Sequence, residues 1–173
     1  MGMNYKNKLS AIDTFIFDVD GVLTNGLVHL IDDQMCRSLN SKDAYAIQYA
    51  RKMNYKIFII TGGDSIDIQN RLLELGATEV RLKSHNKVAV YNELKEKYQL
   101  VDEHVLYMGD DIPDIPLLKM VGLAACPADS SVDVLQNTIY QSPLKGGEGC
   151  VREIMEQVMR VQEKWMKDLA FEW

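Results

Sequence analysis

Five aspartates stand in two groups, and each group directly follows an apolar run of the sequence. The run FIFDVDG carries Asp18 and Asp20, and the run HVLYMGDDIPD carries Asp110, Asp111 and Asp114. Side chains two positions apart on a strand point to the same face, so Asp18 and Asp20 would place two negative charges side by side. This arrangement costs free energy unless a cation or a proton offsets the repulsion.

A hard divalent cation is the natural remedy for so many acids in one place. Mg²⁺ suits a site made of two or three carboxylates, some waters and a substrate phosphate. The alternative is that the aspartates are turn and cap residues, because Asp commonly ends strands and starts helices. The occurrence of DVDG and GDDIPD together, at the ends of two expected strands, favours the metal site over this alternative.

Two further features suit a phosphate group. Thr61, Gly62 and Gly63 follow the apolar run KIFII and precede a helical pattern, so they offer a hydroxyl and free backbone N–H groups near a helix N-terminus. This signal is weak alone, because strand-to-helix turns often use glycine without any ligand. Lys87 starts another helical pattern, where a cation opposes the helix dipole. It either neutralises a phosphate or is a solvated surface lysine.

Short apolar runs alternate with helix-period segments along the chain. Strands are expected at residues 12–19, 56–60, 79–82, 104–108, 122–126 and 138–140. Helices are expected at residues 42–53, 65–76, 87–98, 114–122 and about 150–169. This alternation predicts one α/β domain over residues 1–173, with a mostly parallel, Rossmann-like sheet and helices on both faces. Ligands bind beyond the carboxyl ends of the strands in such a sheet, where the polar clusters fall.

One segment breaks the alternation. Residues 26–39 predict two short strands around a polar turn, which makes a small β-hairpin inserted after the first strand. Its apolar side chains need cover, either from the hairpin's own sheet or from copies of the chain: Leu27, Val28, Leu30, Ile31 and Met35. Only about 24 residues separate Asp18 from the next helix at Lys42, so there is no room for a large cap domain.

Composition excludes several other classes of protein. The formal net charge of −6 argues against a nucleic-acid surface. The three cysteines are far apart and form no CxxC, so a disulfide framework or a zinc site is not expected. No apolar run reaches the length that spans a membrane, and the N-terminal residues lack the apolar core of a signal peptide. We therefore expect a soluble, cytoplasmic protein.

The motifs DVDGVLT, ITGG, Lys87 and GDDIPD, in this order and spacing, resemble the four motifs of the haloacid dehalogenase superfamily of phosphatases. The hairpin, KDAYAIQ and GGEGCVRE resemble the small branch of that superfamily that lacks a large cap. The resemblance implies a Mg²⁺-dependent phosphatase that acts on a small-molecule sugar-acid phosphate. It also implies a homotetramer in which hairpins join at the centre and active sites lie near subunit interfaces.

The resemblance also assigns roles to the first motif. Asp18 would be the nucleophile that forms an aspartyl-phosphate, and Asp20 would be the general acid and then the general base. Gly21 would let the chain turn tightly beside the phosphate. Thr61, the Gly62 N–H and Lys87 would bind the phosphoryl oxygens.

The metal would be held by Asp18, the main-chain carbonyl of Asp20, and Asp110. Asp111 and Asp114 would add a ligand or hold the metal's waters.

The GGEG loop, residues 146–149, could fold over the site, which makes Gly147 and Arg152 candidates for binding substrate. Arg152 could equally be a surface residue of the C-terminal helix.

The substrate expected from the resemblance is the phosphate of an eight-carbon sugar acid, with a nine-carbon relative as the alternative. One departure bears on this choice: related phosphatases often carry a basic residue just after TGG, whereas Asp64 follows Gly63 here. A receiver domain also uses Mg²⁺ and a phosphorylated Asp, but it has no carboxylate two residues on and no hairpin. A third possibility is a catalytically inactive binding module, although the catalytic positions are all present.

Overall fold

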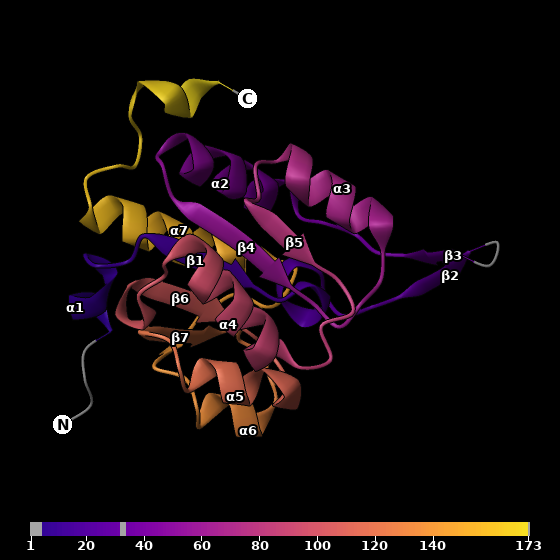
Figure 1. Ribbon diagram of the computed structural model, residues 1–173. Coiled ribbons are helices and arrows are strands. Elements are labelled where there is room, and N and C mark those ends of the chain that lie inside the picture. The colour runs from indigo at the N-terminus through magenta and orange to yellow at the C-terminus, as the bar shows by residue number, and fades with distance from the viewer. Residues whose placement is uncertain (1–4, 32–33, 173) are drawn as a thin grey trace.

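The computed structural model describes residues 5–31 and 34–172. Its main sheet has six strands: β1 (Thr14–Phe17), β4 (Lys56–Ile60), β5 (Glu79–Arg81), β6 (Val105–Met108), β7 (Leu123–Cys126) and β8 (Tyr140–Gln141). They are ordered β5-β4-β1-β6-β7-β8, and every neighbouring pair is parallel (Figure 1). The predicted parallel sheet is therefore confirmed, with β1 between β4 and β6.

Helices cover both faces of this sheet, as predicted (Figure 1). One face packs against α1 (Lys6–Leu9), α2 (Ser41–Lys52), α3 (Ile66–Glu74) and α7 (Cys150–Val161), and the other against α4 (Lys87–Tyr98), α5 (Ile115–Leu118) and α6 (Val132–Leu135). Successive strand side chains alternate between the two cores: Phe15 and Phe17 face the first and Ile16 the second. The strands are apolar throughout because both of their faces are buried.

Polar side chains at the helix starts explain where the helices begin. The side chain of Asn40 accepts a hydrogen bond from Lys42 N at the start of α2, and that of Ser65 accepts one from Ile68 N at the start of α3. These acceptors satisfy backbone N–H groups that have no partner inside the helix.

The C-terminal helix α7 begins at Cys150 as predicted but ends at Val161, so the predicted extension to residue 169 is wrong. The chain leaves the helical path at Glu163, which has a φ of +56°. This turn lets Trp165 pack edge-on against the ring of Tyr49 on α2, with ring centroids 5.4 Å apart. A short 3₁₀ turn, η4 (Asp168–Phe171), follows. Trp165 is 9% exposed in this position, while Phe171 is 75% exposed and Trp173 lies outside the described residues.

The hairpin consists of β2 (His29–Ile31) and β3 (Gln34–Cys36), which pair only with each other, antiparallel, in the part of the chain that the structure describes. It projects away from the main sheet (Figure 1), and Leu30 on it is 79% exposed. The alternative in which the hairpin packs on its own sheet is thus wrong. Its turn falls on residues 32–33, outside the described residues.

None of the helices described here has both the length and the apolar character required to cross a membrane.

A buried carboxylate joins α2 to the start of α7. Asp43 is 1% exposed, and its Oδ1 accepts a hydrogen bond from Arg152 N at 2.7 Å. Burial raises the pKa of Asp43 to about 6, because the desolvation cost exceeds the help from the helix N–H groups. Since the folded state holds this proton more tightly than the unfolded state, the carboxylate lowers stability as the pH rises from about 4 through 6.

We expect Asp43→Asn to keep an acceptor for Arg152 N while removing the buried charge. Relative to the wild type, its free energy of unfolding should therefore rise between pH 4.5 and pH 8, by up to on the order of 2 kcal/mol. Urea unfolding at both pH values measures this difference. The exposed Asp67, in the first turn of α3, provides the matched variant Asp67→Asn, for which little change with pH is expected. A difference for Asp43→Asn that stays constant with pH would contradict the argument.

Candidate active site

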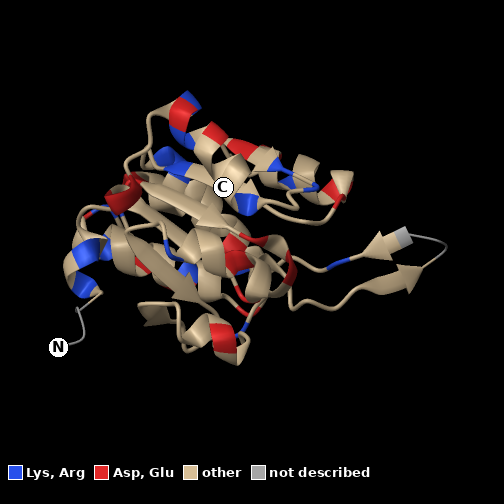
Figure 2. Cartoon of the chain, turned by 60° about the horizontal axis from the view of Figure 1, so that its bottom comes forward, with Lys and Arg blue, Asp and Glu red and all other residues tan. Residues whose placement is uncertain are grey.

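The carboxyl ends of three neighbouring strands open into one pocket. Asp18 follows β1, Thr61 follows β4, and Asp110 follows β6 after one glycine. Their side chains line a cavity of about 480 Å³ together with Asp20, Gly62, Lys87, Asp111 and Asp114. Acidic segments gather at this edge of the sheet, near the base of the hairpin (Figure 2). The predicted placement of the polar clusters at one edge is confirmed.

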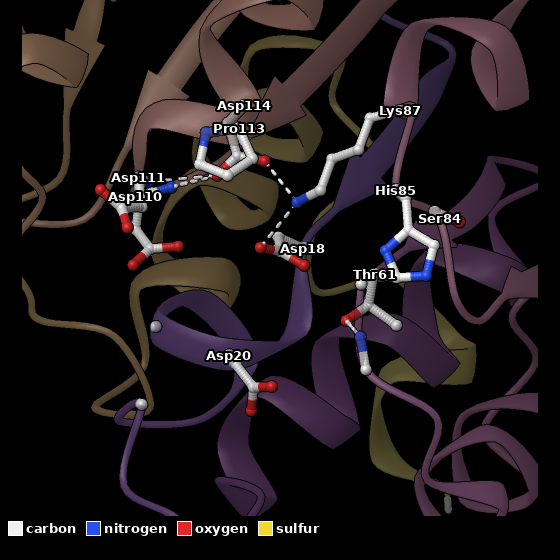
Figure 3. A pocket seen from close by; sticks show the side chains of 14 residues that line it. Asp18, Asp20, Thr61, Ser84, His85, Lys87, Asp110, Asp111, Pro113 and Asp114 are labelled. Atoms are coloured by element: carbon white, nitrogen blue, oxygen red, sulfur yellow. Dashed lines mark hydrogen bonds and ion pairs between the residues drawn. The ribbon is translucent and has the colours of Figure 1, made fainter.

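The ammonium group of Lys87 lies between the carboxylates of Asp18 and Asp114 (Figure 3). Its Nζ is 2.8 Å from Asp18 Oδ2 and 2.5 Å from Asp114 Oδ1, and its side chain is only 6% exposed. Burial disfavours the charged ammonium, but the two carboxylates outweigh this cost and raise the pKa of Lys87 above its usual value. The interpretation of Lys87 as a solvated surface lysine is therefore wrong.

The loop before α4 brings Lys87 to this position. Lys83 N donates to Gly63 O at 2.9 Å, and Ser84 N donates to Thr61 O at 2.9 Å. These two bonds attach the loop that follows β5 to the TGG loop that follows β4. Helix α4 consequently starts beside the pocket, and its first residue is Lys87.

Asp114 is held by four donors. Its Oδ1 accepts from Lys87 Nζ and from the hydroxyl of Tyr107, both at 2.5 Å. Its Oδ2 accepts from Asp110 N at 2.9 Å and from Asp111 N at 3.2 Å. A carboxylate offers about four lone-pair sites, so Asp114 is fully used in orienting its neighbours. Sequence reasoning missed Tyr107. Its hydroxyl is the one polar side-chain group in strand β6, whose pattern predicts only buried core residues.

Three carboxylates are arranged to share a cation. One oxygen each from Asp18, Asp110 and Asp114 lies within 4.8 Å of the others. With all three ionised and Lys87 protonated, this group has a net charge of −2, which a divalent cation would balance. Hard cations prefer such oxygen ligands. Because the contacts of Asp114 are already satisfied, Asp18 and Asp110 are the better placed to bind a metal directly, with Asp114 holding them.

The electrostatics of this cluster show the strain that a cation would relieve. Burial raises the pKa of Asp18 to about 6, with Lys87 opposing the shift and Asp114 adding to it. Burial, followed by repulsion from Asp18 and Asp114, raises the pKa of Asp110 to about 7. Both shifts mean that the ionised carboxylates are costly without a nearby positive charge.

Gly21 permits the close approach of the two acidic motifs. It has a φ of +84°, and a Cβ atom at this position would lie 2.0 Å from Asp110 Oδ2. Glycine is therefore needed here both for its backbone conformation and for space. The tight turn expected at Gly21 is present, and its tightest contact is with Asp110.

Asp20 lies away from the three-carboxylate cluster (Figure 3). Strand β1 ends at Phe17, and Asp20 belongs to a helical loop, η1 (Val19–Leu23), within which its own backbone is extended. The argument from strand spacing therefore fails for this pair, although Asp18 and Asp20 line the same pocket. The carboxylate of Asp20 is paired with Arg37, a residue that sequence reasoning did not select.

Thr61 and Gly62 line the pocket, as the motif predicts. Thr61 is buried, and its hydroxyl oxygen accepts from Gly63 N at 3.1 Å. Asp111 also lines the pocket, but it is exposed and is not part of the three-carboxylate cluster. Ser84 and His85 line the pocket as well, and sequence reasoning missed both because isolated Ser and His residues gave no spacing signal.

Gly147 and Arg152 do not reach this pocket. Gly147 N donates to Val22 O at 2.9 Å, so the GGEG loop packs against the back of the first motif. The guanidinium of Arg152 lies 5.5 Å from the ring centroid of Tyr45 and 5.4 Å from that of Trp165. The structure therefore does not support a substrate contact from either residue within the same chain.

Comparisons with known proteins agree with this geometry. The family model described as haloacid dehalogenase-like hydrolase matches residues 38–122. The 3-deoxy-D-manno-octulosonate 8-phosphate phosphatase KdsC of Escherichia coli (strain K12) is 32% identical over 158 residues, which are 91% of this chain and 84% of that protein. The chain belongs to the haloacid dehalogenase-like hydrolase family, which confirms the resemblance seen in its motifs.

Solved structures extend the likeness to the whole fold. A 3-deoxy-D-manno-octulosonate 8-phosphate phosphatase from Yersinia pestis superposes with a TM-score of 0.90 at 31% identity, covering 93% of this chain and 88% of that one. The corresponding enzyme from Moraxella catarrhalis, in complex with a magnesium ion, a phosphate ion and KDO, gives a TM-score of 0.89 at 25% identity, covering 92% of each chain.

The raised pKa values of Asp18 and Asp110 predict how a divalent cation affects stability. Without metal, stability should fall as the pH rises from about 4, where these groups ionise when unfolded, through about 6 to 7. The increase in melting temperature on adding Mg²⁺ should therefore be larger at pH 8 than at pH 5, because the cation then offsets two ionised carboxylates. Differential scanning fluorimetry measures it.

Asp110→Asn is the control for this measurement, since it removes one charge from the cluster. It should lose most of the Mg²⁺-dependent increase at pH 8. An equal increase at both pH values, or an increase that Asp110→Asn retains in full, would contradict the assignment of this cluster as a metal site.

Proposed function

We propose that the protein is a Mg²⁺-dependent phosphomonoesterase that hydrolyses 3-deoxy-D-manno-octulosonate 8-phosphate to the free sugar acid and phosphate. The observation that supports this most strongly is the buried Lys87 between Asp18 and Asp114, next to Asp110 and the TGG loop. This set of residues can receive a phosphate dianion and a divalent cation together. The names of the related enzymes, and the magnesium, phosphate and KDO bound to one of them, support the choice of cofactor and substrate.

In the first half of the reaction, Asp18 attacks phosphorus and the bond from phosphorus to the sugar oxygen breaks. Asp20 gives its proton to that oxygen, so the leaving group departs as an alcohol. Thr61, the Gly62 N–H and Lys87 bind the phosphoryl oxygens and stabilise the charge that develops on them. The product is an aspartyl-phosphate at Asp18.

In the second half, Asp20 takes a proton from a water molecule, which attacks phosphorus and releases phosphate. Asp18 returns to its free carboxylate and Asp20 to its protonated form. Asp18 and Asp110 would hold Mg²⁺, together with the main-chain carbonyl of Asp20, while Asp111 and Asp114 orient the surrounding groups. When bound, the cation supplies neutralisation of the negative charge on the phosphoryl oxygens.

A second candidate substrate is the 9-phosphate of a nine-carbon sugar acid. Asp64 follows Thr61-Gly62-Gly63, where related enzymes often carry a basic residue. If that basic group meets the carboxylate of the eight-carbon acid, its absence favours a substrate that is bound differently. The phosphatase chemistry is the same for both.

A panel of sugar phosphates, assayed for phosphate release with and without Mg²⁺, tests the proposed function. We expect faster release from the eight-carbon ester than from the nine-carbon ester, and loss of release when EDTA is present. Asp18→Asn keeps the size of the nucleophile but removes its charge, so it should abolish turnover. The variant should still show a cooperative thermal unfolding transition, as a folded protein does. Near-normal activity of Asp18→Asn would contradict the nucleophile, and an inactive wild type would contradict the enzyme.

The exposed hairpin supports a homotetramer in which hairpins join and each active site lies near a subunit interface. Its apolar side chains Leu27, Leu30 and Ile31 are all more than half exposed in the single chain. We expect light scattering to give four times the mass of one chain, and Leu30→Asp to reduce this mass. Leu169→Asp, at an exposed position near the C-terminus, should leave the mass unchanged. A monomeric wild type would contradict this assembly.

A further inference from the structure

Arg37 connects the hairpin to the active-site pocket. It directly follows β3, on the arm of chain that returns from the hairpin to α2. Its Nε lies 2.6 Å from Asp20 Oδ1 and its Nη2 lies 3.1 Å from Asp20 Oδ2. The planar guanidinium therefore donates to both carboxylate oxygens. Such two-point contacts make arginine–carboxylate pairs stronger and more directional than lysine–carboxylate pairs.

The two side chains of this pair differ in exposure, and Asp20 has few other contacts. The side chain of Arg37 is only 9% exposed, whereas that of Asp20 is 36% exposed and opens to the pocket. Among the described residues, the other side-chain contact of the Asp20 carboxylate is a long one, with Thr24 Oγ1 at 3.4 Å. Arg37 thus supplies most of the fixation of the Asp20 carboxylate, which is partly exposed at the pocket.

Gly63 lies beside this ion pair. A Cβ atom at Gly63 would lie 3.6 Å from Asp20 Oδ2 and 3.9 Å from Arg37 Nη2. The pair is therefore packed beside the TGG loop, within van der Waals range of residue 63. Arg37, which comes from the hairpin arm, does not line the pocket itself but contacts Asp20, which does.

We propose that Arg37 is a positioning residue that holds the Asp20 carboxylate in place for proton transfer to the leaving oxygen. This inference rests on the proposed phosphatase activity. Arg37 uses one lone pair on each oxygen of Asp20, and the remaining lone pairs can carry the proton. The proton passes from Asp20 to the sugar oxygen as its bond to phosphorus breaks, and Arg37 itself gains and loses none.

The dependence of the rate on the leaving group tests this role. A sugar alcohol leaves only with a proton, whereas p-nitrophenolate leaves with little help, so a misplaced general acid harms the first substrate far more. In Arg37→Ala we expect kcat for the preferred sugar phosphate to fall on the order of tenfold to a hundredfold. The kcat for p-nitrophenyl phosphate, measured with the same Mg²⁺-loaded protein, should fall less than about threefold.

Three variants give this experiment its controls. Arg37→Lys, which keeps the charge but makes one contact in place of two, should show an intermediate loss on the sugar phosphate. Asp20→Asn combined with Arg37→Ala should be no slower than Asp20→Asn alone, because Arg37 acts through Asp20. Arg71→Ala removes an exposed arginine on α3 and should leave both rates unchanged.

The outcomes separate this inference from the proposed function. A wild type that releases no phosphate from any sugar phosphate contradicts the proposed function. A wild type that is active, with equal losses on both substrates in Arg37→Ala and in Arg37→Lys, shows a structural role and overturns the positioning role. Additive losses in the double variant would also overturn it. A loss confined to the sugar phosphate and absent in Arg71→Ala supports it.

Discussion

The ammonium group of Lys87, buried between the carboxylates of Asp18 and Asp114, is the interaction on which the rest of the site depends. Without it, three acidic side chains would meet at the ends of β1 and β6 with no fixed positive charge among them. An unpaired buried charge is far more costly than a paired one. Backbone hydrogen bonds attach the loop from β5 to α4 to the TGG loop, and this attachment places Lys87 beside the pocket.

Asp114 connects the Lys87 ion pair to the rest of the site. Its four donors come from α4, from the core strand β6 and from the backbone of the acidic loop. A carboxylate satisfied in this way cannot swing, so it fixes Lys87 on one side and the backbone of Asp110 on the other. The rigidity leaves Asp18 and Asp110 with defined positions and with lone pairs still available. That is the arrangement a metal-assisted phosphoryl transfer requires, because such chemistry relies on positioning and electrostatic stabilisation.

The hairpin arm contributes one further contact to the site, through Arg37. The fold has no large cap domain, and the hairpin arm reaches the pocket through the contact of Arg37 with Asp20. Arg37 is the group that the arm contributes, and its guanidinium pairs with Asp20 beside Gly63. The apolar residues of the hairpin itself are exposed in the single chain, so they take no part in the core that supports the site.

The sequence alone determined the parallel sheet, the hairpin, and the five aspartates, Thr61 and Lys87 as one site, because these follow from local periodicity and from motifs whose order is kept. It also placed the start of α7 correctly. Only the tertiary structure decided that Asp20 leaves the face of Asp18, that Tyr107 and Arg37 hold the two acids, and that Arg152 stacks on aromatic rings far from the pocket. These outcomes depend on contacts between residues distant in the chain, and on where β1 and α7 stop. Neither hydrophobic period nor residue spacing carries that information.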